Sequence, residues 1–192
     1  MKLARTAFFA HTVSTDLALV PFSPEIVDDY HELHVRNHDR IRLSEPAPAL
    51  PPSRAEAEAL LLSSGQAWLR GTAVPVAIAH RSDGLEKLVG AANLRINAYL
   101  QSAEVGIWID AEWEGRGIAK EALSVLIDYG FNSVKLARIS LRTASENTRC
   151  RALAKGLGFS EEGTHRKAIP LPGGRSDEVV YGLLAEDWDR RR

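Results

Sequence analysis

The sequence has little cysteine, no long apolar run and almost no net charge. One cysteine in 192 residues excludes an intrachain disulfide and a zinc site built from cysteines, and it suits a reducing cytoplasm. No apolar stretch approaches the about 20 residues that a membrane-spanning helix needs, so we expect no membrane partner. A formal net charge of −1 provides no basic field, and we expect no direct nucleic-acid binding.

The chain does contain enough apolar sequence for a sizeable core. Hydrophobic residues make up 45% of it and charged residues 26%, which is the balance of an ordinary globular protein. A length of 192 residues fits one domain. Residues 1–10 faintly resemble a signal peptide, but Arg5 and Thr6 interrupt their apolar part too early for one. We therefore expect a cytoplasmic protein.

Apolar periodicity and turn residues predict the order of strands and helices. Strands are expected at residues 17–22, 74–79, 87–94, 103–109, 138–142, 163–170 and 178–184. Helices are expected at residues 24–38, at 53–69, from 117 onward and at 147–157. A proline-dense loop at residues 44–52 and a turn at residues 81–84 join these elements. The order β-αα-βββ-α-β-α-ββ predicts an α/β fold with a mixed sheet of about seven strands and about four helices.

The most informative segment is residues 104–119, where a strand runs into a glycine-bearing turn that opens a long amphipathic helix. Strand alternation places Glu104, Gly106 and Trp108 on one face of the sheet. Unpaired backbone N–H groups at such a turn make a phosphate site. The spacing fits neither the P-loop nor the dinucleotide-binding fingerprint. By itself, the turn is equally well an ordinary connection between a strand and a helix.

A second segment, residues 147–159, changes this balance. Asn147 caps the helix expected there, Cys150 lies in its first turn, and Gly158 ends it. Together the two segments resemble the GNAT superfamily of acyl-CoA N-acetyltransferases, and most of all its ribosomal-protein serine/alanine N-terminal acetyltransferase branch. The resemblance covers about residues 15–188 and implies a GNAT fold, with a mostly antiparallel sheet, in a single domain over residues 1–192.

The resemblance implies that acetyl-CoA is the co-substrate. The family's pyrophosphate motif, Gln/Arg-x-x-Gly-x-Gly/Ala, falls here on Glu114, Gly115, Arg116, Gly117, Ile118 and Ala119. Backbone groups of Ile107, Trp108 and Ile109 would pair with pantetheine along the strand edge, and Asn147 would hydrogen-bond it. Glu114 departs from the family pattern, because a carboxylate beside a pyrophosphate repels it unless the side chain turns to solvent.

The resemblance also implies two catalytic residues. Cys150 stands where the branch has a serine that protonates the leaving thiolate, and a thiol in the first turn of a helix has a lowered pKa. Its alternative role is packing as a small hydrophobe. Glu104 matches the position of a general base, its alternative being a solvated strand residue. His31, His34 and His38 have metal-ligand spacing, but we favour a solvated helix face and expect no metal.

The expected function is acetyl transfer from acetyl-CoA to a primary amine by direct attack on the thioester. The expected acceptor is a protein N-terminal α-amine, such as that of a ribosomal protein, and the loop at residues 44–52 is expected to wall its site. Two alternatives stay open: a small amine of polyamine or aminoglycoside-like type as the acceptor, and a non-catalytic domain that senses acyl-CoA. Whether the chain forms a homodimer is also left open.

Overall fold

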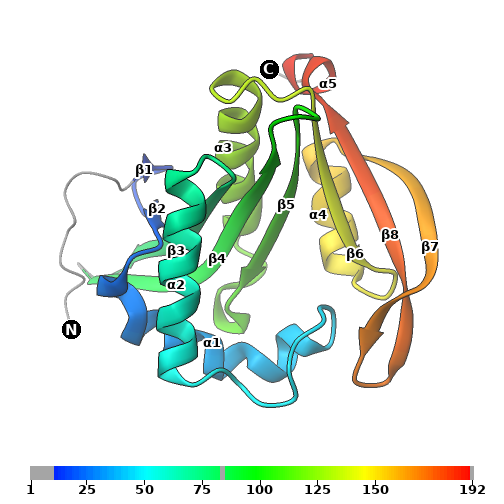
Figure 1. Cartoon of the computed structure of the whole chain (residues 1–192). Helices are drawn as coiled ribbons and strands as arrows, with labels where there is room; N and C mark the ends of the chain where they lie inside the picture. Colours follow the sequence, from blue (N-terminus) through cyan, green and yellow to red (C-terminus); the bar gives the residue numbers. More distant parts are fainter. Residues whose placement is uncertain (1–10, 83–84, 191–192) are drawn as a thin grey trace.

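The strands of this protein form one mixed sheet in the computed structural model, which describes residues 11–82 and 85–190. Its eight strands lie in the order β1-β2-β3-β4-β5-β6-β8-β7 (Figure 1). They are β1 (His11–Thr12), β2 (Leu17–Pro21), β3 (Ala73–Ser82), β4 (Leu85–Asn97), β5 (Ser102–Ile109), β6 (Arg138–Ala144), β7 (Ser160–Leu171) and β8 (Gly174–Leu184). Neighbouring strands are antiparallel, except that β5 and β6 run parallel.

Five α-helices connect or follow these strands in the described part of the chain. They are α1 (Val27–Arg42), α2 (Arg54–Leu69), α3 (Ile118–Asn132), α4 (Thr148–Leu157) and α5 (Ala185–Asp189), with short 3-10 helices η1 (Pro24–Ile26) and η2 (Ala111–Trp113). No helix in the described ranges combines the length and apolar character that a bilayer crossing requires.

The predicted α/β order of elements is confirmed, with two additions. Strand β1 has two residues and helix α5 has five, and elements that short carry no measurable periodicity in a sequence. They raise the number of strands to eight and of α-helices to five among the described residues. The predicted turn at residues 81–84 falls partly on residues 83–84, which lie outside the described residues, as do residues 1–10.

Helices cover both faces of the sheet (Figure 1). On one face, α3 and α4 bury apolar side chains such as Leu123, Ile127 and Leu157 against the strands. On the other face, α1 and α2 pack Leu33 and Leu61 over β3 and β4. Each of these five side chains is at most 2% exposed, so burial of apolar surface on both faces stabilises the sheet.

Capping residues set the boundaries of α2 and α4 where the sequence predicts them, whereas the helix expected at residues 24–38 begins as η1 without a side-chain cap and runs to Arg42. Ser53 and Glu56 form a capping box at the start of α2. The Asn147 side chain accepts a hydrogen bond from the Cys150 backbone N–H at the start of α4, and Gly158 ends α4 in the left-handed conformation with φ of 92°. These local signals place the first turn of α4 beside the separating ends of β5 and β6 (Figure 1).

Candidate active site

The candidate site begins where β5 and β6 separate. The two strands pair only at residues 102–104 and 138–140, and they diverge beyond that point (Figure 1). From residue 105 to Ile109, β5 keeps β4 as its one partner among the described strands. Its other edge, at Ile107, Trp108 and Ile109, therefore carries backbone groups that can pair with an extended ligand.

A turn of two left-handed glycines follows this open edge. Gly115 has φ of 74° and Gly117 has φ of 80°. Residues other than glycine rarely adopt this left-handed backbone conformation. A Cβ atom at Gly115 would meet nothing within 4 Å, and one at Gly117 would meet only Glu121 Oε1 at 4.0 Å. The space beside both glycines is thus open, and the N–H groups at the start of a helix can bind an anion such as a pyrophosphate.

The side chains of this turn are engaged elsewhere. The guanidinium of Arg116 lies 4.6 Å from the centre of the Trp113 ring and donates to the Glu112 carbonyl at 3.1 Å. Ile118 is buried in the core, and Ala119 packs partly buried against it. A ligand over residues 115–119 would therefore meet main chain rather than these side chains.

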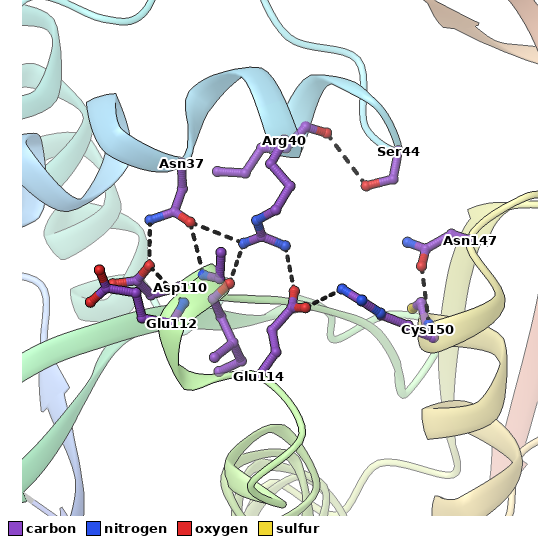
Figure 2. Close-up of polar contacts among 12 residues, drawn as sticks. Asn37, Arg40, Ser44, Asp110, Glu112, Glu114, Asn147 and Cys150 are labelled. Atoms are coloured by element: carbon purple, nitrogen blue, oxygen red, sulfur yellow. Dashed lines mark hydrogen bonds and ion pairs between the residues drawn. The ribbon is translucent and has the colours of Figure 1, made fainter.

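Glu114 is the exception, because its side chain lies beside the turn and is held by two arginines. Its carboxylate does not turn to solvent, since the side chain is 25% exposed and lies between two arginines. Arg40 of α1 donates to Oε1 at 2.5 Å, and Arg149 of α4 donates to Oε2. Figure 2 shows the carboxylate between α1 and the first turn of α4. The expected repulsion of a pyrophosphate is thus offset by two positive charges against one negative charge.

A buried carboxylate at the end of β5 anchors α1 to the site. Asp110 is 1% exposed and accepts hydrogen bonds from Arg36 and, at 3.2 Å, from Asn37. The Asn37 side-chain oxygen in turn accepts from the Ala111 N–H at 3.1 Å and from Arg40 at 3.2 Å (Figure 2). Burial raises the pKa of Asp110, but these hydrogen bonds outweigh burial and hold its pKa below the ordinary value.

This network was missed at the sequence level. The strand pattern marks Asp110 only as the end of β5, and Asn37 as one polar residue of an amphipathic helix. Both residues are buried, and a buried polar group needs a partner. Their partnership spans 73 residues of sequence, so no local spacing could have shown it.

Cys150 lies in the first turn of α4, as predicted, but its thiol is not activated. Burial raises the pKa of the thiol, a hydrogen bond from Thr143 lowers it by less, and the Glu45 charge raises it further. The expectation of a lowered pKa is therefore wrong, because removal of the thiol from water outweighs its hydrogen bond with Thr143. Cys150 also packs partly buried against the core beside Leu153.

Glu104 is held by two arginines on the face of the sheet opposite α3. Arg95 of β4 donates to one carboxylate oxygen, and Arg142 of β6 lies 3.4 Å from the other. Arg142 also reaches Glu178 of β8 at 3.5 Å, and Glu178 contacts His165 of β7 at 2.9 Å. A row of alternating arginine and glutamate side chains therefore crosses β4, β5, β6 and β8 beside the open edge of β5, and it ends at His165 of β7.

The loop after α1 brings another carboxylate to this space. The charge of Glu45 acts on Arg95, on Cys150 and on Tyr30. Loss of water around the Glu45 carboxyl raises its pKa, with Arg95 opposing, although the residue as a whole is exposed. Burial together with the charge of Glu45 raises the pKa of Tyr30 to about 12. The sequence analysis predicted that this loop walls the acceptor site but did not identify Glu45.

The three histidines of α1 are not all on a solvated face, so that expectation is wrong: His31 and His34 are half-buried and His38 is buried. His38 is 2% exposed, and the His34 ring packs edge-on against Trp108 at 5.6 Å between ring centres. Helix α1 buries polar side chains as well as its apolar ones, because aromatic rings of α1 and of β5 pack against each other. No group of three or more metal-binding side chains occurs in the described residues.

Comparison with protein families identifies the family of this chain. The family described as "Acetyltransferase (GNAT) domain" matches residues 16–160, about three quarters of the chain. The chain belongs to the GNAT acetyltransferase family. The glycine turn, the open edge of β5 and the first turn of α4 all lie inside the matched residues.

Curated relatives match this GNAT protein over part of their length. YdaF of Bacillus subtilis (strain 168) is 38% identical over 89 residues, which is 46% of this chain and 49% of YdaF. The [Ribosomal protein uS5]-alanine N-acetyltransferase of Escherichia coli (strain K12) is 28% identical over 54% of each chain. The spermidine N(1)-acetyltransferase of Vibrio cholerae is 37% identical over 42% of this chain and 47% of its own. This chain thus spans about half the length of the curated relatives it matches.

Solved structures share the GNAT fold over nearly the whole chain. RimL, a ribosomal L7/L12 α-N-protein acetyltransferase solved in complex with coenzyme A, has a TM-score of 0.85 and 22% identity, over 92% of this chain and 98% of its own. At this identity the likeness shows the fold. The predicted GNAT fold is therefore confirmed.

Proposed function

We propose that this chain is an acetyl-CoA-dependent N-acetyltransferase whose catalytic domain comprises about residues 15–188. One observation carries the proposal: the open edge of β5 leads directly into a left-handed glycine turn at the N-terminus of α3. An extended, amide-bearing ligand that ends in a pyrophosphate matches both features together. The single cysteine supports a place for this activity in the reducing cytoplasm.

The proposed binding roles follow from the open groups of the site. The N–H groups of residues 115–119 hold the pyrophosphate, and the edge of β5 at Ile107, Trp108 and Ile109 pairs with pantetheine. Asn147 uses its side-chain oxygen to cap α4, accepting from the Cys150 N–H at 3.1 Å. Its amide NH₂ is the group that would donate to a pantetheine carbonyl.

The proposed reaction is direct attack of a neutral amine on the thioester carbonyl. A C–N bond forms and the C–S bond breaks, while a backbone N–H of β5 stabilises the developing negative charge on the oxygen. The amine loses one proton and the departing thiolate gains one. Cys150 is the proposed proton donor, since a raised pKa keeps its thiol protonated at neutral pH. Glu104 is the proposed base, acting through water, and Glu45 is a second carboxylate in the same space.

The proposed acceptor is a protein N-terminal α-amine. An α-amine with a pKa near 8 is about one tenth neutral at pH 7, so deprotonating it costs about 1.4 kcal/mol, against about 4.6 kcal/mol for a lysine with a pKa near 10.4. Glu104, the proposed base, already contacts two arginines. The acceptor whose deprotonation costs less free energy is therefore favoured.

The charges beside β5 also disfavour a polyamine, the substrate named for the Vibrio cholerae relative. Glu104 and Glu178 are each already paired with a cation, and the row they belong to contains Arg95 and Arg142. A polycation would have to displace these arginines. A peptide brings one cationic amine and therefore competes with fewer of these arginines.

A peptide panel tests this proposal. The protein is incubated with acetyl-CoA and one of three acceptors: a peptide with a free N-terminus, an N-blocked peptide with one lysine, or spermidine. Free thiol release gives kcat/KM, and mass spectrometry locates the acetyl group; an N-blocked peptide with glutamine for lysine is the control. We expect the free N-terminus to be preferred.

A preference for lysine or spermidine would contradict the proposed acceptor. Binding of acetyl-CoA with no thiol release on any acceptor would instead favour the non-catalytic acyl-CoA-sensing alternative. The absence of acetyl-CoA binding would overturn the proposed function itself.

A further inference from the structure

Glu114 links two helices that flank the proposed cofactor site. Its Oε1 accepts from Arg40 of α1 at 2.5 Å, and its Oε2 accepts from Arg149 of α4. Figure 2 shows Glu114 reaching up to Arg40 from the turn, with Asn147 and Cys150 of α4 on its other side. The ion pair to Arg149 therefore spans the space between the glycine turn and α4.

The two arginines are anchored very unequally. The Arg40 side chain is 33% exposed, and it also donates to Asn37 Oδ1 at 3.2 Å and to the Ile109 carbonyl. The Arg149 side chain is 79% exposed, and Glu114 is its one hydrogen-bonding or ionic partner among the residues that the structure describes. Releasing Arg40 would break hydrogen bonds to three acceptors, whereas releasing Arg149 would break one.

An exposed arginine with one carboxylate partner exchanges that partner easily. Exposed ion pairs add little stability because water and salt screen them. A phosphate group offers the same fork-shaped geometry with more negative charge, and arginine binds it through two parallel hydrogen bonds. An anion seated on the glycine turn next to Glu114 would compete for Arg149 directly.

We propose that Arg149 is the side chain that recognises the phosphate groups of acetyl-CoA, and that Glu114 holds it across the site until they displace the carboxylate. Arg40 keeps Glu114 after this exchange, since its contacts with Asn37 and Ile109 do not depend on Arg149. The Glu114 carboxylate then stays neutralised beside the bound phosphates. This inference rests on the proposed function in one respect, namely that acetyl-CoA is the ligand.

Calorimetric titration of Arg149→Gln tests the role of the arginine. We expect a Kd for acetyl-CoA about tenfold weaker, which is about 1.4 kcal/mol, and an unchanged Kd for S-acetyl-pantetheine, which has no phosphate. Arg70→Gln, the same change at an exposed residue after α2, is the control and should bind as wild type. Titration with 3′-dephospho-acetyl-CoA identifies the phosphate: a retained tenfold loss assigns the pyrophosphate, and no loss assigns the 3′-phosphate.

Glu114→Gln tests the holding role. Removing the competing carboxylate charge should tighten acetyl-CoA binding about threefold, and the double variant with Arg149→Gln should lose that gain because no arginine remains to be released. Weaker binding by Glu114→Gln, with an unchanged melting temperature, would contradict the holding role.

The proposed function and this inference fail in different ways. A wild-type protein that binds no acetyl-CoA would overturn the function. Wild-type binding that Arg149→Gln leaves unchanged, or an equal loss for S-acetyl-pantetheine, would overturn the inference alone.

Discussion

Replacing Asp110 tests how α1 is held against the end of β5. Its carboxylate is 1% exposed and accepts from Arg36, from Asn37 at 3.2 Å and from the Glu112 N–H at 3.4 Å. A hydrogen bond to a charged group contributes about 1.5–3 kcal/mol, and the cost of burying the charge offsets part of the sum. Asp110→Ala should therefore lower the free energy of unfolding by about 3–5 kcal/mol, as breaking a buried ion pair usually does.

Thermal unfolding followed by circular dichroism measures this loss. For a chain of this size, about 3–5 kcal/mol corresponds to a melting temperature lower by about 6–20 °C. Asp110→Asn keeps the side-chain shape but removes the charge, so its loss should be intermediate. Asp189→Asn, the same change at an exposed residue of α5, is the matched control and should stay within about 0.5 kcal/mol of wild type.

The pH dependence checks the same reasoning. Hydrogen bonds hold the pKa of Asp110 below its ordinary value of 3.8, so the ionised carboxylate stabilises the folded state above that pH. This stability is lost as the pH falls through the lowered folded-state pKa. The difference between wild type and Asp110→Asn should shrink over that acidic range. Equal melting temperatures for Asp110→Asn and Asp189→Asn at neutral pH would refute the network argument.

Three further outcomes are expected. Gly117→Val should weaken acetyl-CoA binding at least tenfold, about 1.4 kcal/mol, because its side chain would enter the open turn at a φ of 80°. Cys150→Ala should lower kcat by about 10²-fold, at the low end for a general acid, because the raised pKa of the thiol makes it a weak donor; Cys150→Ser should keep part of the rate. Burial, followed by the charges of His38 and His31, lowers the pKa of His34. The folded state should therefore lose stability as the pH falls below about 6.5, where the unfolded histidine gains a proton, and His34→Gln should reduce this loss.

Matched variants give these measurements their controls. Gly163→Val adds the same side chain at an exposed position of β7 where a Cβ meets nothing within 4 Å, and it should bind acetyl-CoA as wild type. If the folded Cys150→Ala and Cys150→Ser variants both react at the wild-type rate, Cys150 is not the proton donor and contributes only to packing. For the pH series, His11→Gln changes an exposed histidine; if it reduced the loss as much as His34→Gln does, burial of His34 would not be the cause.

The sequence by itself determined the features that depend on neighbouring residues. Gly117 allows a left-handed turn before α3, Asn147 caps α4 and Gly158 ends it. Each works through backbone geometry or a hydrogen bond within one helical turn, so a short window of sequence contains the whole signal. The alternation along β5 likewise separated buried Val105 and Ile109 from the face that carries Glu104.

The tertiary structure alone decided which charges meet and which groups lose water. Glu114 pairs with Arg40 across 74 residues and with Arg149 across 35, and the sequence had identified neither partner. Burial decided that the Cys150 thiol has a raised pKa and that His38 lies inside the protein. A pKa and an ion pair depend on every atom packed around a group. Packing brings those atoms from segments that no local pattern connects.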